Sequence, residues 1–176
     1  MEFNFQNLDE ETRSLMLGEI DHDVTEGKLY QSKRFKEGQE IIYLELLKKI
    51  VISGNEKSLA TALKANKCFK THELRKTKSG YTEVKVPENA ESLFAEGEFN
   101  RFYIRALCLR IINKGGSLEI YRARESQNPR KESEILIGNI IDAKQLLNDL
   151  RENIGIDTVL GLPPGPNSGL SVKIIT

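Results

Sequence analysis

The stretch Glu83-Val84-Lys85 carries the one catalytic pattern that stands out in the sequence. It lies in a run that alternates like a β-strand, and alternate residues of a strand project from the same face. There the Glu83 carboxylate could hold Mg²⁺ while the Lys85 ammonium steadies an attacking water, as in many nucleases. A second acid is also needed, and Glu73 is the only candidate nearby. These three residues predict a Mg-dependent nuclease as one alternative function. The other interpretation is that they are alternating charges on a solvated hairpin.

Ligands for a metal ion are scarce. His22 and His72 are the only histidines, and Cys68 and Cys108 are the only cysteines. A structural zinc site normally shows two closely spaced ligand pairs, which this set does not supply. The sequence also contains no Gly-x-Ser-x-Gly elbow, and its glycine-rich segment 161–169 lacks the Lys-Ser/Thr pair of a phosphate loop. We therefore expect no metal, no cofactor and no catalytic residues, which favours a non-enzymatic protein.

Arginine is concentrated in one part of the chain. Residues 101–130 contain six arginines and a single lysine, whereas residues 61–85 contain six lysines and one arginine. The planar guanidinium suits partly buried contacts with carboxylate or phosphate, and lysine suits solvated charge. The candidate interaction residues are Arg101, Arg105, Arg122, Arg124 and Arg130. The alternative is an internal network with the acids Glu98, Glu119, Glu132 and Glu134.

The segment 161–169 is a second candidate contact surface. Proline restricts the unbound loop and so reduces the entropy lost when a partner docks. The candidate residues are Pro163, Pro164, Pro166 and Asn167. The alternative is that this segment is a plain connector.

The formal net charge is zero, but the charges are unevenly distributed. Residues 1–26 contain eight acids and one base, and residues 61–85 contain seven bases and two acids. The basic segment could meet an acidic surface, either on a partner or on the N-terminus of the same chain. The acidic segment could instead mimic nucleic acid in an inhibitor or regulatory partner of a nucleic-acid enzyme. A nucleic-acid partner is disfavoured, because it calls for net positive charge and exposed aromatic residues among the bases.

The elements that position these residues follow from hydrophobic spacing and turn residues. Apolar spacing predicts helices over residues 8–26, 41–52 and 55–66, with Asn55 as an N-cap. A hairpin is expected over 71–87, followed by a helical stretch from residue 88 that Gly97 interrupts and that resumes at Phe99. The remaining predicted elements are strands at 118–123, 135–141 and 170–175 and a helix that begins at Asp142.

This order predicts an α+β fold. We expect a helical N-terminal part, residues 1–66, and an α+β part, residues 67–176, joined in one unit with a small mixed or antiparallel sheet packed on a long central helix. The apolar runs, such as residues 50–52, are far too short for a membrane span, and the N-terminus resembles no secretory signal. The expected location is the cytoplasm, or a virion in the case of a phage protein.

Three stretches together resemble a family of uncharacterised proteins encoded by bacteriophages and prophages. They are EFNRFYIRALCLR at 98–110, YRAR at 121–124 with NPRKESE at 128–134, and LGLPPGPNSGLSV at 160–172. The resemblance covers about the last eighty residues and, more loosely, the N-terminal helices. It implies a phage setting and transfers no catalytic residue.

The predicted function is therefore that of a non-enzymatic interaction or assembly protein, such as a bacteriophage virion component. Its expected partners are other proteins, either virion proteins or further copies of the chain.

Overall fold

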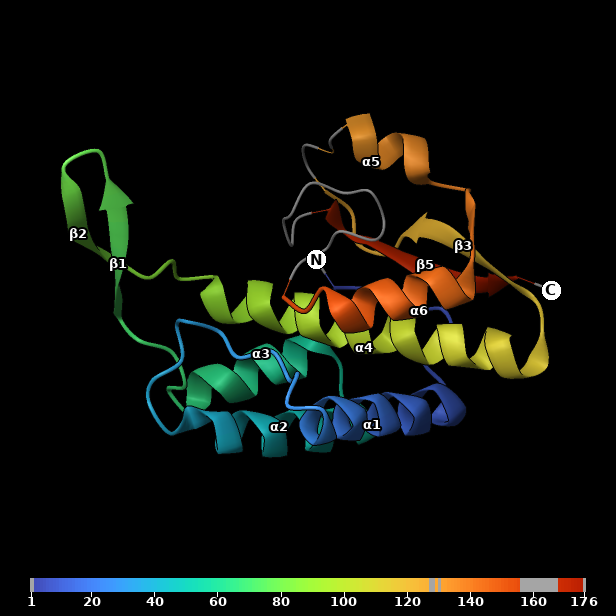
Figure 1. Ribbon diagram of the computed structural model, residues 1–176, viewed down its shortest axis with the longest axis horizontal. Helices are drawn as coiled ribbons and strands as arrows, with labels where there is room; N and C mark the ends of the chain where they lie inside the picture. Colours follow the sequence, from blue (N-terminus) through green and yellow to red (C-terminus); the bar gives the residue numbers. More distant parts are fainter. Residues whose placement is uncertain (1, 127–128, 130, 156–167, 176) are drawn as a thin grey trace.

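The computed structural model of the protein describes residues 2–126, 129, 131–155 and 168–175. It confirms the predicted α+β class and the long central helix. In Figure 1, helix α4 (Ala90–Lys114) runs through the middle of the molecule, with the N-terminal helices along one side and a small sheet with the C-terminal helices along the other.

The expected interruption of the central helix at Gly97 is wrong, because α4 is continuous from Ala90 to Lys114. A glycine inside a helix costs about 1 kcal/mol relative to alanine, which tertiary packing can exceed. Here the neighbouring residues Ala95, Glu98 and Phe99 are all buried. Helix α4 is buried on more than one side because it packs against both layers.

The N-terminal layer consists of α1 (Glu10–Thr25), α2 (Gln39–Ser53) and α3 (Glu56–Ala65). Helices α1 and α3 both begin with a side-chain N-cap. The carboxylate of Asp9 accepts a hydrogen bond from the Thr12 amide at 2.9 Å, and the side chain of Asn55 accepts one from the Ser58 amide at 3.0 Å. These bonds satisfy amides that a helix start otherwise leaves without partners, which confirms the predicted cap at Asn55.

The other layer holds an antiparallel sheet in the order β4 (Ile140–Ile141), β3 (Ser117–Arg122) and β5 (Leu170–Ile175). The outer elements here are α5 (Lys131–Leu136) and α6 (Ala143–Glu152). Helix α6 begins as predicted, with the Asp142 carboxylate accepting a hydrogen bond from the Gln145 amide at 2.8 Å. The predicted strand over 135–141 is mostly wrong. Its first residues end α5, and a turn at Gly138 (φ +84°) leaves only a two-residue strand.

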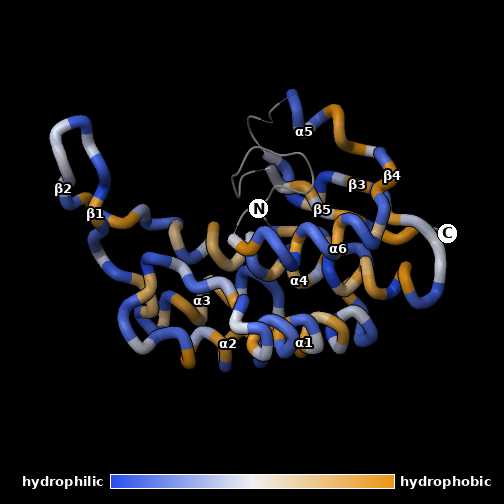
Figure 2. The backbone as a smooth tube through the Cα atoms, viewed as in Figure 1, coloured by the Kyte–Doolittle hydropathy of each residue, from blue (hydrophilic) through white to orange (hydrophobic). Residues whose placement is uncertain are grey.

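The predicted hairpin is confirmed, and it stands apart from the two layers (Figure 1). Strands β1 (His72–Thr77) and β2 (Gly80–Lys85) pair in antiparallel register, with His72 opposite Lys85 and Thr77 opposite Gly80. Ten of the twelve strand residues are exposed, and Figure 2 shows that the hairpin is mostly hydrophilic. The hairpin therefore adds little to the hydrophobic core.

Candidate functional site

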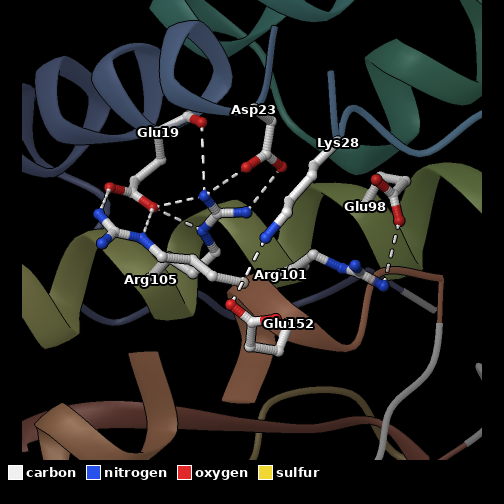
Figure 3. A network of polar contacts seen from close by, with 8 residues as sticks. Glu19, Asp23, Lys28, Glu98, Arg101, Arg105 and Glu152 are labelled. Carbon is white, nitrogen blue, oxygen red and sulfur yellow. Dashed lines mark hydrogen bonds and ion pairs between the residues drawn. The ribbon is translucent and has the colours of Figure 1, made fainter. Parts of the chain in front are cut away.

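Arg105 lies at the centre of a buried ion network between α4 and α1 (Figure 3). Its side chain is 0% exposed. Its Nε donates to Oε2 of Glu19 at 2.6 Å, and its two Nη atoms each donate to an oxygen of Asp23 at 2.7 Å. Arg151 of α6 also donates to Glu19, through its Nε at 3.0 Å. Three elements are thus joined by charge-assisted hydrogen bonds.

The electrostatics of this network stabilise its charged form. Burial acts to raise the pKa of Glu19, but hydrogen bonds and charges from Arg151 and Arg105 outweigh it, so the pKa of this carboxyl is lowered. Burial acts to lower the pKa of Arg105, but Asp23 and Glu19 outweigh it and raise that pKa. The network holds layers together, and Arg105 is not accessible to a partner.

Three more of the predicted arginines also lie in ion pairs within the chain. Arg101 pairs with Glu98 at 3.5 Å, both of them buried. Arg124 pairs with Glu96 at 3.3 Å, and Arg122 pairs with Glu134. These predicted interaction residues are therefore committed to pairs within the chain. Of the acids in the alternative of an internal network, Glu98 and Glu134 pair with arginines, whereas Glu119 pairs with Lys173. Arg130, Pro163, Pro164, Pro166 and Asn167 lie outside the described residues.

The acidic N-terminal segment supplies acids that the sequence analysis did not assign to the arginines. Six of its eight acids make ion pairs with bases elsewhere in the chain. They are Glu2, Asp9, Glu11, Glu19, Asp21 and Asp23. The uneven charge distribution was the signal for such pairing, although the partners are chiefly arginines of α4 and α6 and not the basic segment 61–85. An exposed acidic surface that could mimic nucleic acid is largely removed by these pairs.

The nuclease residues do not converge. Glu83 and Lys85 lie on the same face of the hairpin, as alternation predicts, but Glu73 is opposite Val84 and so lies on the other face. The Glu73 carboxylate is also held by Arg34, which donates from Nε at 2.7 Å and from Nη2 at 2.8 Å. These hydrogen bonds lower the pKa of Glu73. Within the described part of the chain, no three histidine, cysteine or acidic side chains are grouped to hold a metal ion.

The hairpin and its connections, residues 69–87, form a projection that we call the arm. Its outer face, away from Arg34, carries His72, Leu74, Lys76, Tyr81, Glu83 and Lys85. Leu74 and Tyr81 are each 71% exposed, which is high for large apolar side chains. Lys76 lies directly opposite Tyr81 in the register, so a basic side chain and an aromatic ring are side by side near the turn of the hairpin.

A groove of about 540 Å³ lies at the base of the arm, and we call it the lysine groove. Its lining includes Lys36, Lys64, Lys67, Lys70 and Lys85, with Glu88 and Glu91 as its acids. Lys85 pairs with Glu88 at 3.6 Å. For the other four lysines, no salt bridge with a described carboxylate is present. The lysine groove is therefore a site of net positive charge, which the sequence indicated only as a basic segment.

The chain matches no known protein-family model, no curated protein and no solved structure. None of the helices in the described ranges combines the length and the apolar run that a bilayer crossing needs.

Proposed function

We propose that this chain is a non-enzymatic interaction protein that docks onto an acidic macromolecule through the arm and the lysine groove. The observation that carries the proposal is the separation of charge in the folded chain. Four of the eight N-terminal acids, Asp9, Glu11, Glu19 and Asp23, pair with the buried Arg105 or the largely buried Arg110, whereas Lys64, Lys67 and Lys70 at the base of the arm are exposed. A chain with zero net charge thereby presents one basic surface.

The exposure of the arm supports a contact role. An isolated two-stranded hairpin is at best marginally stable in water, and stability normally requires a further strand or a packed face. With the described part of the chain, the arm makes such contacts near its base, where Phe35 bridges to Phe69 and Arg34 binds Glu73. A partner on the outer face would cover Leu74 and Tyr81, the two large apolar side chains that the arm leaves exposed.

The phage setting implied by the resemblance would make this protein an assembly component, with a virion component as the partner. The alternative of a regulator that uses its acidic N-terminus has less support, because only Glu10 and Glu26 of that segment lack a salt bridge among the described residues. A nuclease has less support because Glu73 and Glu83 lie on opposite faces of the arm.

The test compares two variants of equal net charge. Lys64→Glu with Lys70→Glu reverses charge at the lysine groove, and Lys49→Glu with Lys144→Glu reverses it at exposed positions on α2 and α6. We expect retention on an immobilised polyanion such as heparin to fall strongly for the first variant and little for the second. Circular dichroism would check that both variants are folded. Equal retention of the two variants would contradict the proposal, since the position of the charge would then not matter.

A further inference from the structure

Resting on the proposed function, we infer that the acidic macromolecule is double-stranded DNA, with the arm in its major groove and the lysine groove against its phosphates. The inference joins the shape of the arm, the chemistry of its exposed side chains and the choice of lysine over arginine on this surface.

The shape of the arm fits the groove of B-form DNA. Each strand has six residues, which corresponds to about 20 Å at roughly 3.3 Å per residue. The major groove is about 12 Å wide and about 8.5 Å deep, and it admits a two-stranded β-ribbon. The arm meets the main steric requirement, because both of its faces are exposed over most of their length.

The exposed side chains match the groups that base pairs present in the major groove. Arg75, Lys76 and Lys78 can donate to the N7 and O6 acceptors of guanine. Leu74 and Tyr81 offer apolar contact to thymine methyl groups, and Glu83 can accept a hydrogen bond from the amino group of cytosine. The ribbon thus carries donors, an acceptor and apolar groups. Leu74, Lys76, Tyr81 and Glu83 lie on the outer face, Arg75 lies on the opposite face, and Lys78 lies in the turn.

The lysine groove would supply the contacts to the backbone. Lys64, Lys67 and Lys70 are exposed and lie beside the connections of the arm. Ammonium groups bind phosphates as point charges and release the counterions condensed on DNA, which gives binding a strong dependence on salt. Glu88 and Glu91 lie on the same groove and oppose an anion, but the five lysines outnumber them.

The preference for lysine over arginine on this surface favours DNA over an acidic protein as the partner. Interfaces between proteins are enriched in arginine and depleted in lysine, because the guanidinium fork matches a carboxylate. In this chain the arginines of α4 and β3 are committed to internal pairs, and the basic segment 61–85 contains six lysines and one arginine. A surface of exposed lysines is therefore less typical of an interface between proteins than of solvated contacts with phosphate, which ammonium groups bind as point charges.

The side chains and shape of the arm also indicate which kind of nucleic acid would bind. Binding of single strands relies on several aromatic rings on which successive bases stack. Within the arm, all of which is described, Tyr81 is the one exposed aromatic residue, since Phe69 is buried. Double-stranded RNA has a deep, narrow major groove that side chains cannot enter. We therefore expect DNA duplex to bind more tightly than either alternative.

The experiment measures fluorescence anisotropy of a labelled 20-base-pair DNA duplex mixed with the full chain over a range of salt concentrations. The comparison ligands are an RNA duplex of the same sequence, the single DNA strand and labelled poly-glutamate. We expect the DNA duplex to bind at least tenfold more tightly than the other three. Lys64→Ala with Lys70→Ala should lower the magnitude of the slope of log K against log salt by about 2, at roughly 0.9 per lost phosphate contact. Lys49→Ala with Lys144→Ala should leave the slope unchanged.

A second variant tests the arm separately from the lysine groove. Leu74→Ser with Tyr81→Ser should weaken binding of the DNA duplex about tenfold or more, with the salt slope unchanged, because these side chains are uncharged. Equal affinity for RNA and DNA duplexes, or tighter binding of the single strand, would overturn the inference. Binding of poly-glutamate without binding of DNA would overturn it while leaving the proposed function standing. Failure to bind any of the four polyanions would remove both.

Discussion

Replacement of Arg105 by methionine should be among the most destabilising single substitutions in this protein. The guanidinium is fully buried and makes three short hydrogen bonds to the carboxylates of Glu19 and Asp23. Methionine fills most of the same volume, so the loss is chiefly electrostatic. Glu19 keeps its contact with Arg151, whereas Asp23, which is 1% exposed, is left as a buried charge without its partner.

The expected cost follows from this uncompensated charge. Removing one partner of a buried ion pair typically lowers the free energy of unfolding by about 3–5 kcal/mol. A domain is typically stable by about 5–15 kcal/mol, so the variant should unfold at much lower urea concentration. The control is Arg110→Met. Arg110 pairs with Asp9 and Glu11, whose side chains are 52% and 37% exposed, and donates to Thr12. A pair with an exposed carboxylate contributes about 1 kcal/mol or less, and neither carboxylate is left buried when Arg110 is removed.

Urea unfolding followed by circular dichroism measures both variants. The double variant Arg105→Met with Asp23→Leu should recover most of the stability that the single variant loses, because apolar side chains can replace a buried ion pair at little cost. A loss for Arg105→Met no larger than that for Arg110→Met would refute the reasoning. So would a double variant as unstable as the single one, because the buried carboxylate would then not be the cause.

Three further changes test other parts of the fold. Tyr43→Phe should stabilise the protein by about 1 kcal/mol in urea unfolding, because the buried Tyr43 hydroxyl has no hydrogen-bond partner among the described residues; a clear loss would contradict this. Burial raises the pKa of Glu56 above its ordinary value of 4.5, so the contribution of this carboxyl to stability is full below pH 4.5 and is lost as the pH rises through the folded pKa. Glu56→Gln should therefore flatten the profile of stability against pH between 4.5 and the folded pKa. An unchanged profile would count against this reasoning. Gly155→Ala should lower the melting temperature more than Gly27→Ala does. Both have positive φ, but only at Gly155 would the added carbon meet the ring of Tyr30, at 2.5 Å, and equal shifts would show that this contact is relieved without cost.

The proposals rest on how the fold distributes a balanced set of charges. The acidic segment 1–26 and the basic segment 61–85 do not neutralise each other, because the arginines of α4 and α6 pair with four of the eight acids. The lysines at the base of the arm then remain on the surface. A zero net charge in the sequence is therefore compatible with one strongly basic surface in the structure.

Local signals in the sequence were enough to predict most elements. The caps at Asn55 and Asp142, the turn before Gly80 and the apolar spacing of the helices depend on residues within one or two turns of one another. Such local signals predict a helix or strand correctly in any fold that contains it. The errors at Gly97 and over 135–141 arose where packing or a turn outweighed local preference.

The sequence by itself determined most of the elements, the fold class and the separation of lysine from arginine along the chain. The tertiary structure alone decided that Arg105 would meet acids more than eighty residues away, and that Glu73 and Glu83 would face opposite sides of the arm. The physical reason is range. Caps, turns and periodicity act between near neighbours, whereas the pairing of charges and their burial depend on which helices pack together, and that follows from the free energy of the whole core.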